Sequence, residues 1–144
     1  MAREETIETL HATSVAIGGR AVLLCGPSGM GKSDLALRLI DRGAILISDD
    51  YTILKWVDGR LEATAPPTIT GKMEVRGLGV VDMPCIDYAR VALIVDLSSD
   101  IDRMPPDLEE RVIAGADVPV VKIAPLEASA PIKVELALKT MGLM

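Results

Sequence analysis

A glycine-rich loop between an apolar run and a helical segment constrains the fold of this chain more than any other feature. The loop reads Gly26-Pro27-Ser28-Gly29-Met30-Gly31-Lys32-Ser33 and fits the pattern G-x-x-x-x-G-K-[ST] of a phosphate-binding P-loop. In such a loop the backbone N–H groups surround the phosphates, the lysine contacts the β- and γ-phosphates, and the last hydroxyl ligates Mg²⁺. The motif therefore predicts that residues 26–33 bind a nucleoside triphosphate together with Mg²⁺.

The flanking residues supply the setting that a P-loop requires. Residues 21–25 form a continuous apolar run, typical of a buried strand, that leads directly into the loop. After the loop, residues 35–40 carry apolar side chains at helical spacing, and Asp34 and Arg38 form an exposed i,i+4 pair. Gly43 stands where a helix would end. We therefore expect a strand, a phosphate loop and a helix in that order.

Composition limits the remaining possibilities. A chain of 144 residues suits one domain, and a net charge of −6 with no Phe argues against a nucleic-acid partner. Residues 1–6 are acidic where a signal peptide would be basic and apolar, and no apolar run approaches the ~20 residues that span a bilayer. We expect a cytoplasmic protein with no membrane partner, in which Cys25 and Cys85 are reduced. The 49% hydrophobic content is compatible with an oligomer.

The only histidine is predicted to lie beside the phosphates. Residues 10–17 resemble a strand, and Gly18-Gly19 is typical of a two-residue hairpin before the P-loop strand. If Ile17 pairs with Arg20, the register places His11 opposite Gly26, the first residue of the loop. His11 is thus a candidate active-site residue, although a lone histidine is often only a hydrogen-bonded polar group.

Two carboxylates follow the next predicted strand, residues 44–48. Asp49 and Asp50 would lie at the end of this strand, where P-loop proteins place a carboxylate that holds Mg²⁺ or accepts the proton of an attacking hydroxyl. Neighbouring residues of an extended chain point to opposite faces, so one aspartate can serve the site while the other faces elsewhere. The alternative interpretation is that Asp49 and Asp50 form only a solvated turn at the end of the strand.

The rest of the chain predicts further strands and one helix. Residues 73–82 contain two short apolar stretches around a Gly-x-Gly turn flanked by Glu74 and Arg76, and alone they predict two strands with a surface ion pair. The other predicted elements are a hairpin of residues 51–57 and 60–64 turning at Asp58-Gly59, a strand at 91–97, and a helix starting near Pro131.

Four segments together resemble the catalytic domain of HPr kinase/phosphorylase. They are Leu10-His11, the P-loop, Ser48-Asp49-Asp50, and residues 74–82, which are similar to a signature of that family. The resemblance runs from about residue 6 to residue 142 and is to a short form with the catalytic domain only. It implies one α/β domain over residues 1–144, a P-loop nucleotide-binding fold with a mixed twisted sheet, PEP-carboxykinase-like and HPr-kinase-like.

The resemblance also implies an activity and the residues that perform it. Family members use ATP and Mg²⁺ to phosphorylate a serine of HPr, a small phosphocarrier of the sugar phosphotransferase system, and they assemble as hexamers. By this resemblance His11 is an active-site residue, Lys32 is the P-loop lysine, and Ser33 and Glu74 are Mg²⁺ ligands. Asp50 matches the base that accepts the serine proton, and Asp49 is the second choice for that base. Arg76 is expected in the nucleotide site, and Arg103 resembles an arginine that contacts phosphate.

Two departures from the family bear on the activity. A basic, glycine-containing stretch that serves dephosphorylation is replaced by residues 124–129, which carry Glu127 instead, so we expect weak phosphorolysis. Residues 83–90 are shorter than the family's helical segment, which reduces the surface for docking HPr. The alternatives are a nucleotide-dependent switch with no phosphoprotein product and a P-loop kinase of small molecules.

Overall fold

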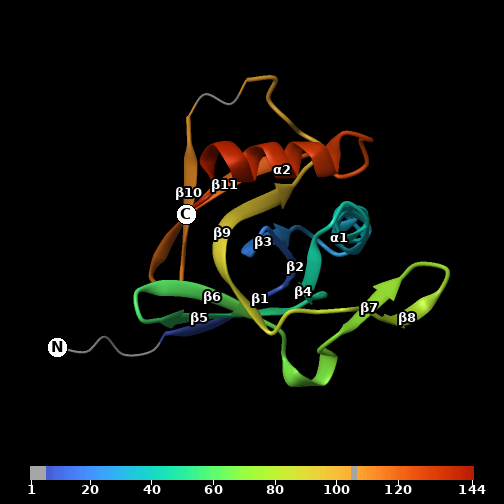
Figure 1. The fold of residues 1–144 in the computed structure, drawn as a ribbon. Coiled ribbons are helices and arrows are strands. Elements are labelled where there is room, and N and C mark those ends of the chain that lie inside the picture. The colour runs from blue at the N-terminus through green and yellow to red at the C-terminus, as the bar shows by residue number, and fades with distance from the viewer. Residues whose placement is uncertain (1–5, 105–106) are drawn as a thin grey trace.

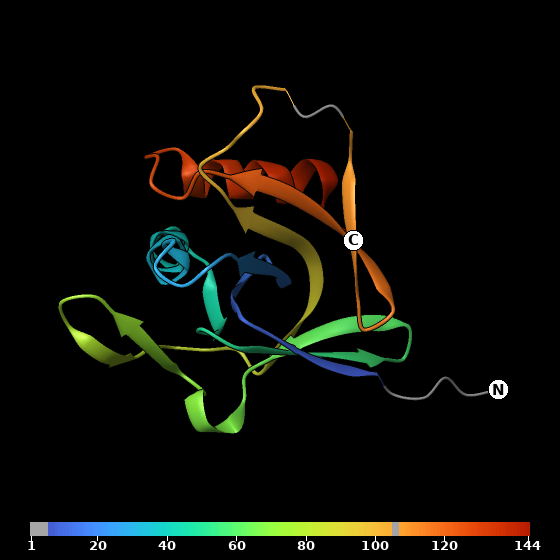
Figure 2. The ribbon, with the colours of Figure 1, turned by 180° about the vertical axis from the view of Figure 1, so that it is seen from behind.

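A curled mixed sheet and two helices form the body of the protein (Figures 1 and 2). The structure is a computed structural model that describes residues 6–104 and 107–144. Residues 1–5, which make up most of the acidic N-terminal segment, lie outside the described residues. In chain order the elements are β1 Ile7–Leu10, β2 Ala12–Ile17, β3 Arg20–Cys25, α1 Lys32–Asp41, β4 Ile45–Ser48, β5 Thr52–Val57, β6 Arg60–Thr64, a 3₁₀ turn Pro67–Ile69, β7 Lys72–Val75, β8 Gly79–Asp82, β9 Tyr88–Leu97, β10 Glu109–Ile113, β11 Ala116–Ile123 and α2 Ala130–Met141.

The P-loop strand β3 lies in the centre of the sheet. The strand order is β1-β5-β6-β9-β3-β2-β4, and the end of β9 also pairs with β11, which pairs with β10. β3 and β9 are parallel, whereas β2 is antiparallel to both of its neighbours, β3 and β4. The predicted α/β fold with a mixed twisted sheet is therefore confirmed. None of the described helices is long and apolar enough to cross a bilayer.

Side chains of β3 alternate between two cores. Val22 and Leu24 pack with α1 and α2, while Leu23 and Cys25 pack with β5, β6 and the β10–β11 hairpin on the other face. This alternation is the period of two expected of a strand, and burial on both faces explains why the run is continuously apolar. The apolar run that the sequence showed at 21–25 thus supports the loop from within the sheet.

The hairpin register before the P-loop is confirmed. Ile17 pairs with Arg20, and the register runs to the pair Ala12 and Cys25, so His11 and Gly26 are the next residues of the two strands. The prediction of one strand over residues 10–17 is wrong at its start, because the strand is interrupted at His11. The residues before His11 belong to β1, which pairs with β5 and not with β3.

Helix α1 agrees with its sequence signals. It begins at Lys32, directly after Gly31, and ends at Asp41. Gly43 has φ 110°, a left-handed conformation that favours glycine after a helix end. The Asp34–Arg38 pair forms with an N–O distance of 3.1 Å.

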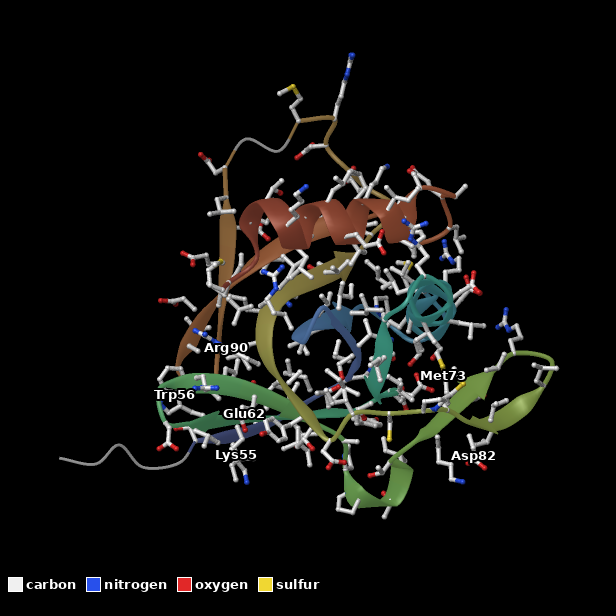
Figure 3. All side chains as sticks on the ribbon, in the orientation of Figure 1. Lys55, Trp56, Glu62, Met73, Asp82 and Arg90 are labelled. Carbon is white, nitrogen blue, oxygen red and sulfur yellow. The ribbon has the colours of Figure 1, made fainter. Side chains whose placement is uncertain are left out.

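The other predicted hairpins also form. The β5–β6 turn has φ 48° at Asp58 and 82° at Gly59, as a type I′ turn requires. The β7–β8 hairpin is a separate two-stranded sheet that extends from the body in Figure 1. Its attachment is Met73, which points from β7 toward α1 and is buried in the core on the helix side (Figure 3).

Candidate functional site

The P-loop closes over the buried side chain of Lys32. The Lys32 ammonium donates hydrogen bonds to the carbonyl oxygens of Gly26 at 2.7 Å and Pro27 at 3.2 Å. Gly29 and Gly31 have φ values of 81° and 104°, which other residues rarely adopt. The sequence of the loop therefore produces the backbone that a phosphate cradle needs, with the lysine charge at its centre.

Asp49 connects the P-loop helix to two strands. Its Oδ1 accepts hydrogen bonds from the Ser33 hydroxyl at 2.6 Å and the Thr13 hydroxyl at 3.0 Å. Its Oδ2 accepts a hydrogen bond from the backbone N–H of Glu74 at 3.0 Å. Asp49 is buried, so α1, β2 and β7 converge on a carboxylate that is held in one orientation.

Asp50 faces the other way and meets the histidine. Its backbone has φ 70°, and its N–H donates to the Thr13 hydroxyl at 3.1 Å. The Asp50 carboxylate lies 2.7 Å from Nε2 of His11, whose ring stacks on Tyr51 with centroids 5.1 Å apart. The two aspartates thus diverge as predicted, Asp49 into the protein and Asp50 toward solvent.

The carboxylates of Asp49 and Asp50 differ in solvent exposure, and this difference suits them to different roles. The side chains of Asp50 and His11 are 58% and 37% exposed, so a substrate hydroxyl can reach them. A carboxylate hydrogen-bonded to an imidazole can accept a proton from such a hydroxyl. Asp49 is 6% exposed and is already bound by three donors, which suits a structural or metal-binding carboxylate better than a base.

Ser33 and Asp49 fit a Mg²⁺ site. Mg²⁺ prefers oxygen ligands and is usually held by one or two carboxylates together with substrate phosphates and water. Within the described residues, no group of three or more His, Cys, Asp or Glu side chains forms a metal cage. Glu74 contacts Asp49 through its backbone, and it is exposed on β7, so its role as a metal ligand stays a prediction.

Both arginines predicted to belong to the site are exposed. Arg76 lies in the β7–β8 turn, and Arg103 lies in the segment between β9 and β10. In the part of the chain that the structure describes, no hydrogen bond or ion pair joins either arginine to the P-loop. The surface ion pair of the β7–β8 hairpin joins Lys72 to Asp82, not Glu74 to Arg76.

The segment of residues 124–129, which replaces the family's basic stretch, lies beside the end of the P-loop. Arg38 of α1 donates hydrogen bonds to the carbonyl oxygens of Pro125 and Glu127. A Cβ built on Gly31 would lie 3.7 Å from Pro125, so this segment covers the start of α1. The Glu127 carboxylate lies 2.6 Å from Lys133 and is therefore charge-paired.

Sequence reasoning missed a second charged pair at this end of the sheet. Asp96, near the end of β9, accepts a hydrogen bond from Arg111 of β10 at 3.1 Å and is the register partner of Cys25. Burial raises the pKa of the Cys25 thiol to about 11, and the positive charges of Arg111 and Lys32 oppose this shift. Asp96 comes directly after the apolar run of residues 91–95, much as Asp49 comes after β4, so a carboxylate after an apolar run is a signal that could have found it.

Comparison with known proteins identifies the family. Residues 3–137 match the family described as the HPr Serine kinase C-terminal domain. The chain belongs to this family. The resemblance inferred from the P-loop, the aspartate pair and residues 74–82 is thereby confirmed.

Similar proteins in the HPr kinase family come from several bacteria. The chain is 37% identical over 126 residues to an HPr kinase/phosphorylase of Clostridium tetani, covering 79% of this chain and 41% of that protein. It is 33% identical over 129 residues to one of Prosthecochloris aestuarii, covering 81% and 38%. The solved HPr(Ser) kinase/phosphatase of Coxiella burnetii superposes with a TM-score of 0.79 at 26% identity, covering 92% of this chain and 88% of that one. The chain thus spans about two fifths of the length of the curated relatives.

Proposed function

We propose that this chain is an ATP-dependent serine kinase that phosphorylates HPr or a related phosphocarrier protein. The observation that carries the proposal is the pair of contacts at the end of β4: Ser33 with Asp49, and His11 with Asp50. A nucleotide loop alone fits many functions, whereas a solvent-facing base beside it is what transfer to a hydroxyl requires. The HPr kinase/phosphorylase relatives support a serine of a phosphocarrier as the acceptor.

In the proposed reaction each group at the site has one task. The loop amides and Lys32 hold the phosphates of ATP, and Ser33 and Asp49 would hold Mg²⁺, with Glu74 as a further proposed ligand. When bound, Mg²⁺ neutralises charge on the phosphates. The serine oxygen attacks the γ-phosphorus, the bond to the β–γ bridging oxygen breaks, and ADP leaves. Asp50 accepts the hydroxyl proton, and His11 orients its carboxylate.

From the family resemblance we further propose that Arg76 and Arg103 contact phosphate once ligands are present. A cytoplasmic location and assembly into a homo-oligomer, expected as a hexamer, are proposed on the same ground. Phosphorolysis is proposed to be weak because residues 124–129 carry Glu127 in place of a basic, glycine-containing stretch.

Intact mass spectrometry tests the proposed function directly. The protein is incubated with Mg-ATP and candidate phosphocarriers, and we expect one added phosphate on the phosphocarrier. Replacing its acceptor serine by alanine should remove that product. Nucleotide binding with no phosphoprotein would favour a switch, and ATP turnover with a small molecule alone would favour a small-molecule kinase. Either result contradicts the proposed function.

A further inference from the structure

An ion pair between β9 and β10 holds a guanidinium at the P-loop end of the sheet. Arg111 Nη2 lies 3.1 Å from Asp96 Oδ2. Asp96 pairs in register with Cys25, and Gly26 follows Cys25 as the first P-loop residue. Because neighbouring strands are about 4.8 Å apart, the carboxylate that holds Arg111 is one strand away from the start of the phosphate loop.

The backbone beneath Arg111 is fixed in the fold. Ile113, two residues later on β10, is buried in the same core as Cys25, and residues i and i+2 of a strand share a face. The turn that follows is tied down, since the N–H of Ala114 donates to Glu8 Oε2 at 2.9 Å. Arg111 therefore projects from a rigid hairpin on the face that carries Cys25.

The side chain of Arg111 is nevertheless free to change partner. Arg111 and Asp96 are 43% and 31% exposed, and ion pairs with this exposure contribute little to stability. A dianionic phosphate offers a guanidinium more charge than one carboxylate, and two parallel hydrogen bonds. Asp96 thus positions the Arg111 guanidinium but binds it weakly enough for a phosphate to replace the carboxylate.

The charge balance at the site calls for such a cation. Asp49 and Asp50 place two carboxylates where the triphosphate would bind, and the Lys32 ammonium is engaged by loop carbonyls. The pKa of Cys25 responds to both Lys32 and Arg111, so the two cations act on one thiol at the strand end. This supports the placement that the register and the ion pair give.

We propose that Arg111 binds the γ-phosphoryl group, exchanging Asp96 for phosphate when a nucleoside triphosphate occupies the P-loop. The inference deepens the proposed function and rests on it only in requiring a triphosphate ligand. In phosphoryl transfer an arginine in this position stabilises the charge that develops on the transferred group.

Calorimetric binding of two nucleotides tests the inference without any acceptor protein. The non-hydrolysable triphosphate AMP-PNP and ADP are each titrated, with Mg²⁺, into the wild type and into Arg111→Gln. We expect AMP-PNP binding to weaken on the order of 10- to 100-fold, as for the loss of a hydrogen bond to a charged group, and ADP binding to be unchanged. Arg111→Lys should retain part of the affinity.

Two further variants make the result specific. Asp96→Asn removes the competing carboxylate and should tighten AMP-PNP binding. Arg60→Gln, an exposed arginine beside the Asp58–Gly59 turn of the β5–β6 hairpin, is the matched control and should bind both nucleotides as the wild type does. Thermal unfolding of each variant shows whether the fold is retained.

Equal weakening of AMP-PNP and ADP in Arg111→Gln and Arg111→Lys, or no weakening in either, overturns the inference. Selective loss of AMP-PNP affinity upholds it, even when the wild type transfers no phosphate to a phosphocarrier. That combination would refute the proposed function and leave Arg111 as a γ-phosphate ligand.

Discussion

Ser33 at the start of α1 and Asp49 after β4 share a 2.6 Å hydrogen bond, which gives the two adjacent aspartates different surroundings. Asp49 is drawn into the protein, and Asp50 turns outward at φ 70° to meet His11. From the sequence alone the base could have been either residue. The geometry favours Asp50 as the base. Substitution of Asp50 should therefore affect the rate of transfer, whereas substitution of Asp49 should affect stability.

Replacing Asp50 by Asn should slow the transfer of phosphate without weakening nucleotide binding. We expect a loss of about 10²–10⁴ in rate, the usual contribution of a positioned base. Because Asp50 is exposed, the free energy of unfolding should hardly change. Single-turnover transfer to a phosphocarrier measures the rate, and a mild effect here with a large rate loss in Asp49→Asn would show that the base is misassigned.

Replacing Asp49 by Asn should destabilise the protein. The buried carboxylate accepts three hydrogen bonds, and the amide group of Asn would put a donor against the Ser33 hydroxyl, the Thr13 hydroxyl or the Glu74 N–H. We expect the free energy of unfolding to fall by about 1–3 kcal/mol. Urea unfolding measures it, with Asp41→Asn at the exposed end of α1 as control. Equal stabilities of the two variants would contradict this prediction.

Removing the charge of Lys32 should abolish transfer and loosen the loop. Lys32→Met keeps the apolar stem but leaves the Gly26 and Pro27 carbonyls without their ammonium donor. The free energy of unfolding should fall by no more than about 1–3 kcal/mol, because this is the range for hydrogen bonds to a charged group. Circular dichroism and the kinase assay measure the two effects. Wild-type turnover would mean that residues 26–33 are not the active P-loop.

The two cysteines should differ in reactivity. Cys85 is exposed, whereas burial raises the pKa of Cys25 from 9.0 to about 11, and the thiolate is the reactive form. Iodoacetamide at pH 8 should add one group to the native protein, and none to Cys85→Ser. Between pH 9 and 11 the unfolded thiol ionises before the native one, so this group lowers stability as pH rises. Two adducts on the native protein would contradict the burial of Cys25.

Phosphate-dependent dephosphorylation should be slower than the kinase reaction. Residues 124–129 cover the start of α1 with Glu127 in place of a basic residue, although Lys133 neutralises part of that charge. We expect Glu127→Arg to raise phosphorolysis, and Lys133→Gln, which unmasks the carboxylate, to lower it. Loss of phosphate from the phosphorylated acceptor, followed by mass, decides this. Dephosphorylation as fast as phosphorylation would refute the prediction.

Local sequence signals predicted the phosphate loop and its surroundings well. The hairpin register from Gly18-Gly19 placed His11 next to Gly26, and Gly43 marked the end of α1, because a positive φ leaves few other residues possible. These features depend on residues close together in the chain. The same holds for the Asp58–Gly59 turn.

Contacts between segments far apart in the chain could not be predicted from local sequence patterns. The roles of Asp49 and Asp50 depend on hydrogen bonds to Ser33 and His11, which periodicity does not specify. β10 was missed because most of its residues are exposed, which leaves no apolar alternation to detect. Arg111 was missed with it, as its partner Asp96 is on a different strand.

The parallel pairing of β3 with β9 has a consequence for how the protein is made. The two strands are neighbours in the sheet but are separated in the chain by residues 26–87, so Val22 must meet Leu93 across a long stretch of sequence. Such distant pairings close slowly, because the entropy of the intervening loop is lost before the contacts form. A nascent chain that has just emerged through the P-loop therefore carries the complete motif without the strand that supports it. We expect competence to bind nucleotide to arise late in synthesis, only once residues 88–97 have joined the sheet.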